Sequence, residues 1–157
     1  MSNKLEVSFN SPQCGWMSIG FDDGVSEFHT TTAYTPHENA LSEILNGLSS
    51  LLDAQNDRDE FKIAWSRNPE AYDLFFRRSG ATVFFQVVEY PTFNHQKSEG
   101  EIVFSYHGNA KDFCRSFYQT FEQLYNDRET DEFELNWRQP FPFEEYKNFQ
   151  EKVKNYG

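Results

Sequence analysis

Alternating apolar and polar residues open the chain. Residues 5–9 place Leu, Val and Phe at every second position, which is the period of a half-buried β-strand. Residues 16–21 and 25–34 predict two further strands. The Asp23-Gly24 pair between them tolerates the backbone angles of a tight turn, so these two strands are predicted to form a hairpin.

A helical period follows the hairpin. Thr35 is suited to cap a helix, Pro36 to its first position, and Glu38 completes a capping box. The helix is expected to end near Asp53. Its apolar stripe comprises Leu41, Ile44, Leu45, Leu48, Leu51 and Leu52.

The middle of the chain returns to strand patterns. Residues 61–65, 72–78, 82–90 and 101–106 predict four strands. The nearly continuous apolar run at 83–88 is typical of a central strand that is covered on both faces.

Two more helices are predicted near the end of the chain. Asn109 is expected to cap the first, and the second follows Phe141-Pro142, while the acidic stretch 126–134 between them is expected to be a loop. The order of elements predicts an α+β fold. We expect a mainly antiparallel, twisted sheet of about six to seven strands, with two or three helices packed on one face.

Composition adds an aromatic core and a strong negative charge. The chain has 157 residues, which fits a single domain spanning 1–157. Phenylalanine alone accounts for 17 residues, and 25 acidic against 14 basic residues give a net charge of −11. This charge disfavours nucleic acid and anionic membranes as partners and favours a basic protein. A solubilising surface is the alternative meaning of the same charge.

The sequence also bears on location. Residues 1–10 lack the apolar run of a signal peptide, and no run of 18 apolar residues is present. We therefore expect a cytoplasmic protein of bacterial type. Its two cysteines, Cys14 and Cys114, are expected to be reduced and buried.

Motifs of the common enzyme classes do not occur. The histidines at 29, 37, 95 and 107 lack the spacing of a zinc site, and the sequence has no phosphate-binding loop or nucleophile elbow. A Cys114–His107 nucleophile pair is an alternative, but Cys114 beside Phe113 on a helix fits a core thiol better. The chain is therefore predicted to be non-catalytic and to bind no metal or cofactor.

Acidic residues gather in two runs, which are interpreted either as solvated loops or as a docking surface for Lys and Arg. Trp137, Phe141 and Tyr34 are the aromatic residues expected to be exposed beside them. The candidate partner-binding residues are Asp53, Asp57, Asp59, Glu60, Asp127, Glu129, Asp131, Glu132, Glu134 and Trp137.

Several short segments of the sequence occur together in a known group of proteins. They are Trp16-Met17-Ser18-Ile19, Thr30 to Tyr34, Trp65 to Tyr72, Phe76 to Gly80 and Val88 to Pro91, with Trp137 and Phe141-Pro142-Phe143 near the end. With them the chain resembles uncharacterised small bacterial proteins, some of which look like immunity proteins of toxin systems. The resemblance implies a non-enzymatic domain that neutralises a toxin.

Two other functions stay open at this point. The first is a small-ligand-binding protein or enzyme with an aromatic-lined pocket between sheet and helices, in which His29, His107, Arg77 and Glu89 are the residues of interest. The second is a structural module that forms a homodimer through a strand edge or an aromatic patch.

Overall fold

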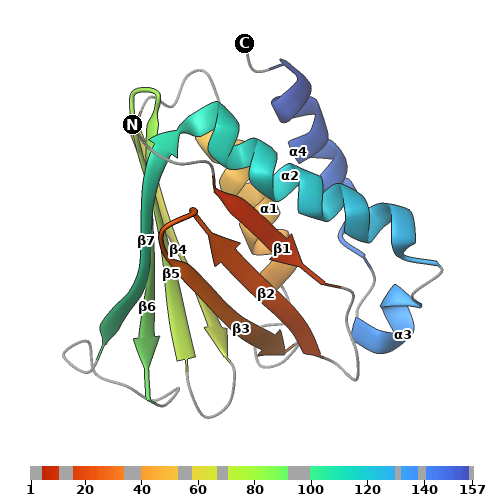
Figure 1. The fold of residues 1–157 in the computed structure, drawn as a ribbon. Helices are drawn as coiled ribbons and strands as arrows, with labels where there is room; N and C mark the ends of the chain where they lie inside the picture. The colour runs from red at the N-terminus through yellow and green to blue at the C-terminus, as the bar shows by residue number, and fades with distance from the viewer. Residues whose placement is uncertain are drawn as a thin grey trace.

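Seven strands and four helices make up the part of the chain that the computed structural model describes (Figure 1). The strands form two antiparallel sheets, of three and of four strands, because the third and fourth strands do not pair. The predicted α+β class and antiparallel pairing are confirmed. The described residues are 5–10, 16–33, 40–52, 58–66, 71–91, 100–129, 132–137 and 141–155.

The three-stranded sheet contains β1 (Glu6–Phe9), β2 (Trp16–Asp22) and β3 (Glu27–Ala33), in chain order. Successive residues of a strand point to opposite faces. The inner face of this sheet is buried, and the outer face carries polar side chains. The inner face contributes Phe9, Met17, Ile19, Phe21 and Thr30.

The four-stranded sheet contains β4 (Arg58–Ser66), β5 (Ala71–Ser79), β6 (Thr82–Tyr90) and β7 (Glu101–Asn109), again in chain order. The predicted central position of residues 82–90 is confirmed. Cover on both faces was a wrong expectation, because Gln86 on the outer face of β6 is exposed. The apolar run reflects a packed inner face and aromatic residues on the outer one.

The helices are α1 (Ala40–Leu51), α2 (Ala110–Asp127), α3 (Phe133–Trp137) and α4 (Phe143–Asn155). Figure 1 shows all four on one side of the β4–β7 sheet. No helix among the described residues is long and apolar enough to cross a membrane.

The helix boundaries match the predicted signals in part. The Asn109 side chain accepts hydrogen bonds from the backbone N–H groups of Lys111 (2.8 Å) and Asp112 (3.4 Å), so the predicted cap of α2 is confirmed. The stretch predicted to be a loop contains the end of α2 and the start of α3. The expected start of the first helix, at residues 35–38, lies outside the described residues.

Aromatic rings join the two sheets and α2 into one core. The ring centroid of Phe21 on β2 lies 5.0 Å from Phe85 on β6, 5.9 Å from Phe104 on β7 and 6.0 Å from Phe117 on α2. Such tilted and edge-to-face pairs add to the stabilisation that burial provides. Because the inner faces meet here, the outer faces of both sheets are left for solvent or for partners.

Candidate functional site

Three carboxylates lie in one row across the outer face of the β1–β3 sheet. Glu6 on β1 is the register partner of Asp22 on β2, and Asp22 is the partner of Glu27 on β3. Directly opposed residues of antiparallel strands have Cβ atoms only about 4.5–5.5 Å apart, and like charges in such pairs destabilise a sheet. We call Glu6, Asp22, Glu27 and the adjacent Asp23 the acidic sheet face.

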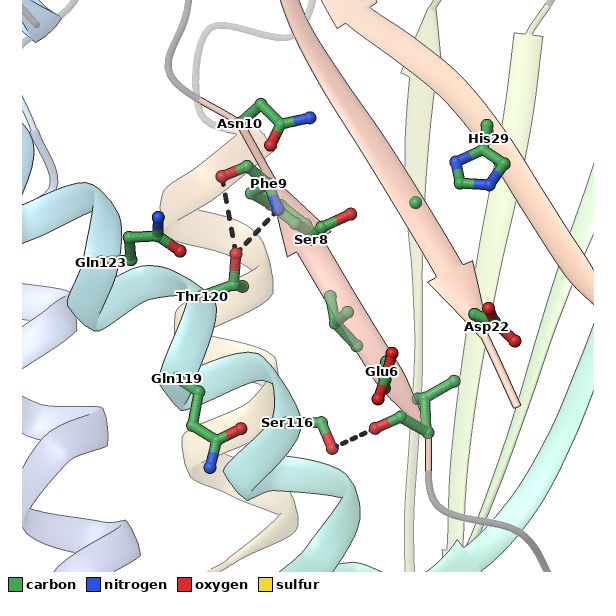
Figure 2. A pocket seen from close by; sticks show the side chains of 13 residues that line it. Glu6, Ser8, Phe9, Asn10, Asp22, His29, Ser116, Gln119, Thr120 and Gln123 are labelled. Atoms are coloured by element: carbon green, nitrogen blue, oxygen red, sulfur yellow. Dashed lines mark hydrogen bonds between the residues drawn. The ribbon is translucent and has the colours of Figure 1, made fainter. Parts of the chain in front are cut away.

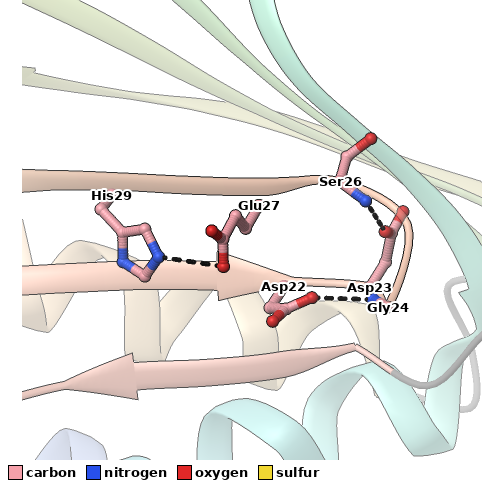
Figure 3. Close-up of polar contacts among 6 residues, drawn as sticks. All are labelled: Asp22, Asp23, Gly24, Ser26, Glu27 and His29. Atoms are coloured by element: carbon pink, nitrogen blue, oxygen red, sulfur yellow. Dashed lines mark hydrogen bonds and ion pairs between the residues drawn. The ribbon is translucent and has the colours of Figure 1, made fainter.

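The turn between β2 and β3 fixes the end of this face (Figure 3). Asp22 Oδ1 accepts a hydrogen bond from the Gly24 N–H at 2.8 Å, and Asp23 Oδ1 accepts from the N–H groups of Val25 (2.9 Å) and Ser26 (2.7 Å). The bonds from Ser26 and Val25 hold the pKa of Asp23 below its ordinary value, since they favour the carboxylate form. The turn therefore keeps a negative charge at the end of the sheet.

His29 lies beside the row on the same face. Its Nε2 is 3.5 Å from Glu27 Oε2, and both side chains are about two-thirds exposed, so this pair contributes little to stability. A Cβ at Gly20, the register partner of His29, would lie 2.7 Å from His29 Nδ1 and 2.9 Å from Ser8 Oγ. The lack of a side chain at Gly20 thus lets Ser8 and His29 lean toward each other over β2.

A hollow of about 430 Å³ lies between β1 and α2, next to this face (Figure 2). Two hydrogen bonds tie its walls together: Thr120 Oγ1 accepts from the Phe9 N–H at 2.7 Å, and Ser116 Oγ donates to the Leu5 carbonyl at 2.5 Å. Its described lining contains no lysine or arginine. The polar lining residues are Glu6, Ser8, Asn10, Asp22, His29, Ser116, Gln119, Thr120 and Gln123.

The hollow has the chemistry of a site for a cationic group. Carboxylates supply charge, and the amide oxygens of Asn10, Gln119 and Gln123 are further acceptors for the N–H groups of Lys or Arg. Among the described residues, no group of three or more His, Cys, Asp or Glu side chains has the arrangement to hold a metal ion. An organic cation such as a basic side chain fits this lining better.

The described members of the two predicted acidic runs lie in different parts of the molecule. Glu60 lies on β4, in the four-stranded sheet. The turn between β5 and β6 of this sheet contacts the start of α2, because the Ala110 N–H donates a hydrogen bond to the Ala81 carbonyl. The described members of the second run lie at the other end of α2 and on α3. The 18 residues of α2 span about 27 Å at 1.5 Å per residue. The described second-run residues are Asp127, Glu129, Glu132 and Glu134.

The remaining members of those runs are not placed. Asp53, Asp57 and Asp131 lie outside the described residues, as does Tyr34. Asp59 belongs to β4, but its side chain is also outside the described part.

Trp137 was wrongly expected to be exposed. Its side chain is 1% exposed and belongs to the hydrophobic core. Phe133 and Trp137 are four residues apart and share the buried side of α3, whereas Leu135 on the same helix is 71% exposed. Phe141 is half-buried and packs against the rings of Tyr125 and Phe133. The buried side of α3, formed by Phe133 and Trp137, is therefore not available to anchor a partner.

The residues of interest for an enzyme fall on different parts of the molecule. His29 lies beside the acidic sheet face, on the outer side of the β1–β3 sheet, while Arg77 and His107 lie on the outer face of the β4–β7 sheet. Glu89 Oε1 accepts a hydrogen bond from the Tyr72 hydroxyl at 3.5 Å. The structure therefore does not bring these four residues together into one site.

Cys114 does not face His107. Cys114 is a fully buried free thiol on α2, and burial raises its pKa well above the ordinary value, so it stays protonated at neutral pH. His107 is exposed on β7. The alternative of a Cys114–His107 nucleophile pair is therefore excluded, and Cys114 is a core thiol as expected; Cys14 lies outside the described residues.

The acidic sheet face was missed because its charges are far apart in the sequence. In the sequence, Asp22 and Asp23 stand next to the glycine of a predicted turn, and Glu6 and Glu27 belong to separate strands. The available signal was the alternation itself, which places Glu6, Asp22 and Glu27 on the polar side of their strands.

Comparisons with protein-family models, with curated proteins and with solved structures found no match to this chain. The resemblance to immunity proteins therefore stays a prediction that rests on the sequence phrases alone.

Proposed function

We propose that this chain is a non-catalytic protein-binding domain that captures a cationic protein through the acidic sheet face. The observation that carries the proposal is the row of Glu6, Asp22 and Glu27, opposed across three strands. The row lies beside a hollow whose described lining contains no lysine or arginine. An inhibitor of the immunity type, acting in the cytoplasm on a basic toxin, is the specific form of this proposal.

The energetics of the row support a binding role. Like charges that are directly opposed across strands destabilise a sheet, so the row costs the fold some stability. No lysine or arginine on the outer face of β1–β3 offsets this cost among the described residues. A cationic partner relieves the repulsion when it binds, so the free energy that the fold loses is recovered in the complex.

The shape of the site supports insertion of a basic side chain. The hollow beside the row extends from Glu6 and Asp22 to the amides of α2. A Lys or Arg that enters it exchanges water for charge-assisted hydrogen bonds, which are about twice as strong as neutral ones. The net charge of −11 adds long-range attraction that speeds encounter with the same class of partner.

The test uses the wild type and two matched variants as baits for pull-down from the native host. The first, called the bait variant below, carries Glu6→Gln, Asp22→Asn and Glu27→Gln and so removes the acidic row. The control replaces Glu144→Gln, Glu145→Gln and Glu151→Gln on α4, which changes the net charge by the same amount. We expect the wild type and the control to retain a protein of net positive charge that the bait variant loses.

Calorimetry with that purified partner then gives the size of the effect. We expect affinity to fall at least 100-fold in the bait variant and less than 3-fold in the control, because only the first change removes the row. Retention of no cationic protein, or equal binding by both variants, contradicts the proposal.

A further inference from the structure

A second hollow lies on the outer face of the β4–β7 sheet, on the side away from the four described helices (Figure 1). Its volume is about 580 Å³, within the range of about 300–1,000 Å³ that is usual for small-molecule sites. Its chemistry differs from that of the acidic sheet face, because the lining combines aromatic rings with basic side chains.

Strand register brings the key groups together. Arg77 on β5 is opposed to Phe84 on β6, and Phe84 is opposed to His107 on β7. In the neighbouring row, Lys62 on β4 is opposed to Phe75 on β5. Two phenylalanines thus lie on the solvent side of the two central strands, where folding alone favours polar residues.

The contacts hold Arg77 in a binding-competent position. Its guanidinium carbon lies 4.6 Å from the centroid of the Phe84 ring, and the Phe84 and His107 rings are 6.0 Å apart with an interplanar angle of 26°. A guanidinium that stacks on a ring keeps its N–H edge free for bidentate recognition of an anion.

The nearby carboxylates leave this guanidinium available. Glu60 is the register partner of Arg77, yet no ion pair within 4 Å joins the two among the described residues. Lys62 is engaged differently, since its Nζ lies 3.8 Å from Asp73 Oδ2. Arg77 is therefore the cation in this hollow that a ligand anion meets first.

We propose that this hollow binds a small aromatic anion, in which a planar ring carries a carboxylate or a phosphate. The ring packs against Phe75, which is 38% exposed, and against the edge of Phe84, while the anionic group accepts hydrogen bonds from Arg77. This site is separate from the acidic sheet face and does not depend on the function proposed for it.

The test titrates benzoate, indole-3-acetate and phenyl phosphate into the full-length chain, with NMR detection of ring and imidazole signals. Cyclohexanecarboxylate serves as the anion without an aromatic ring. Arg77→Gln removes the cation, Glu60→Gln removes a nearby negative charge that repels the anion, and Arg115→Gln on exposed α2 surface is the matched control. Circular dichroism checks that each variant keeps the fold.

We expect saturable shifts at His107 for at least one aromatic anion, with affinity at least 10-fold above that of cyclohexanecarboxylate. Arg77→Gln is expected to weaken binding at least 10-fold, Glu60→Gln to strengthen it, and Arg115→Gln to leave it unchanged. The proposal is overturned if none of the three aromatic anions saturates the site, if the non-aromatic anion binds equally, or if Arg77→Gln and Arg115→Gln have the same effect.

Discussion

The Asp23 carboxylate holds the β2–β3 turn through the backbone N–H groups of Val25 and Ser26. These bonds favour the charged form and lower the pKa of Asp23. A carboxyl group whose pKa is lower in the folded state stabilises the fold above its unfolded pKa of about 3.9. That contribution is lost as the pH falls through the lower, folded-state value.

Asp23→Ala is therefore expected to lower the free energy of unfolding by about 0.5–1 kcal/mol at pH 7, because the turn is exposed to solvent and its hydrogen bonds are weakened by water. The difference from the wild type is expected to shrink as the pH drops below about 4. Urea denaturation at pH 7 and pH 3 measures it. Glu134→Ala, on the exposed side of α3, is the control. A difference of the same size at both pH values rules this account out.

The same turn shows which properties of a single residue can be predicted from the sequence and which cannot. The Asp23-Gly24 pair predicts the turn because both residues tolerate the backbone angles of a tight hairpin, and the structure confirms the hairpin. That Asp22 also faces Glu6 is a matter of strand register. Register depends on the connection between β1 and β2 and on packing of the inner faces, and neither is encoded near Asp22.

At the scale of elements, α3 explains why Trp137 is buried although the sequence analysis predicted it to be exposed. A five-residue helix turns both Phe133 and Trp137 inward, so the tryptophan fills core volume. An acidic neighbourhood in sequence indicated a solvated loop, but the spacing of four between these two aromatic residues is a helical one.

Trp137→Ala is expected to lower the free energy of unfolding by about 3–5 kcal/mol, because it leaves a large cavity in the core. Leu135→Ala on the same helix is expected to change it by less than about 0.5 kcal/mol, since that side chain is exposed. Chemical denaturation compares the two, with Trp137→Phe as a milder variant if the alanine form does not fold. Equal stability of the Trp137 and Leu135 variants contradicts the core placement.

Elements were predicted better than their assembly. The alternation in residues 5–9 and the apolar stripe predicted for the first helix indicate which side of each element is buried, and these sides form part of the core. The division into two sheets depends on the path of the chain between β3 and β4, and the local pattern of apolar and polar residues does not contain this information. The hollows on the outer faces depend on that division and could therefore not be predicted from the sequence.

At the scale of the whole molecule, the two outer sheet faces differ in charge. The β1–β3 face carries the acidic row, while the β4–β7 face carries Arg77 and Lys62 beside Glu60, together with aromatic rings. Two faces of different chemistry on opposite sheets suit two different ligands. The homodimer alternative stays a prediction, and light scattering over a wide concentration range tests it.

Carboxyl footprinting of the complex tests the proposed interface most directly. Carbodiimide coupling of an amine to exposed carboxylates, read by mass spectrometry, is compared for the chain alone and with its captured cationic partner. We predict that the partner protects Glu6, Asp22 and Glu27 and leaves Glu134 and Glu144 as reactive as before. Protection of Glu134 or Glu144, with Glu6, Asp22 and Glu27 still fully labelled, would contradict a binding role for the acidic sheet face.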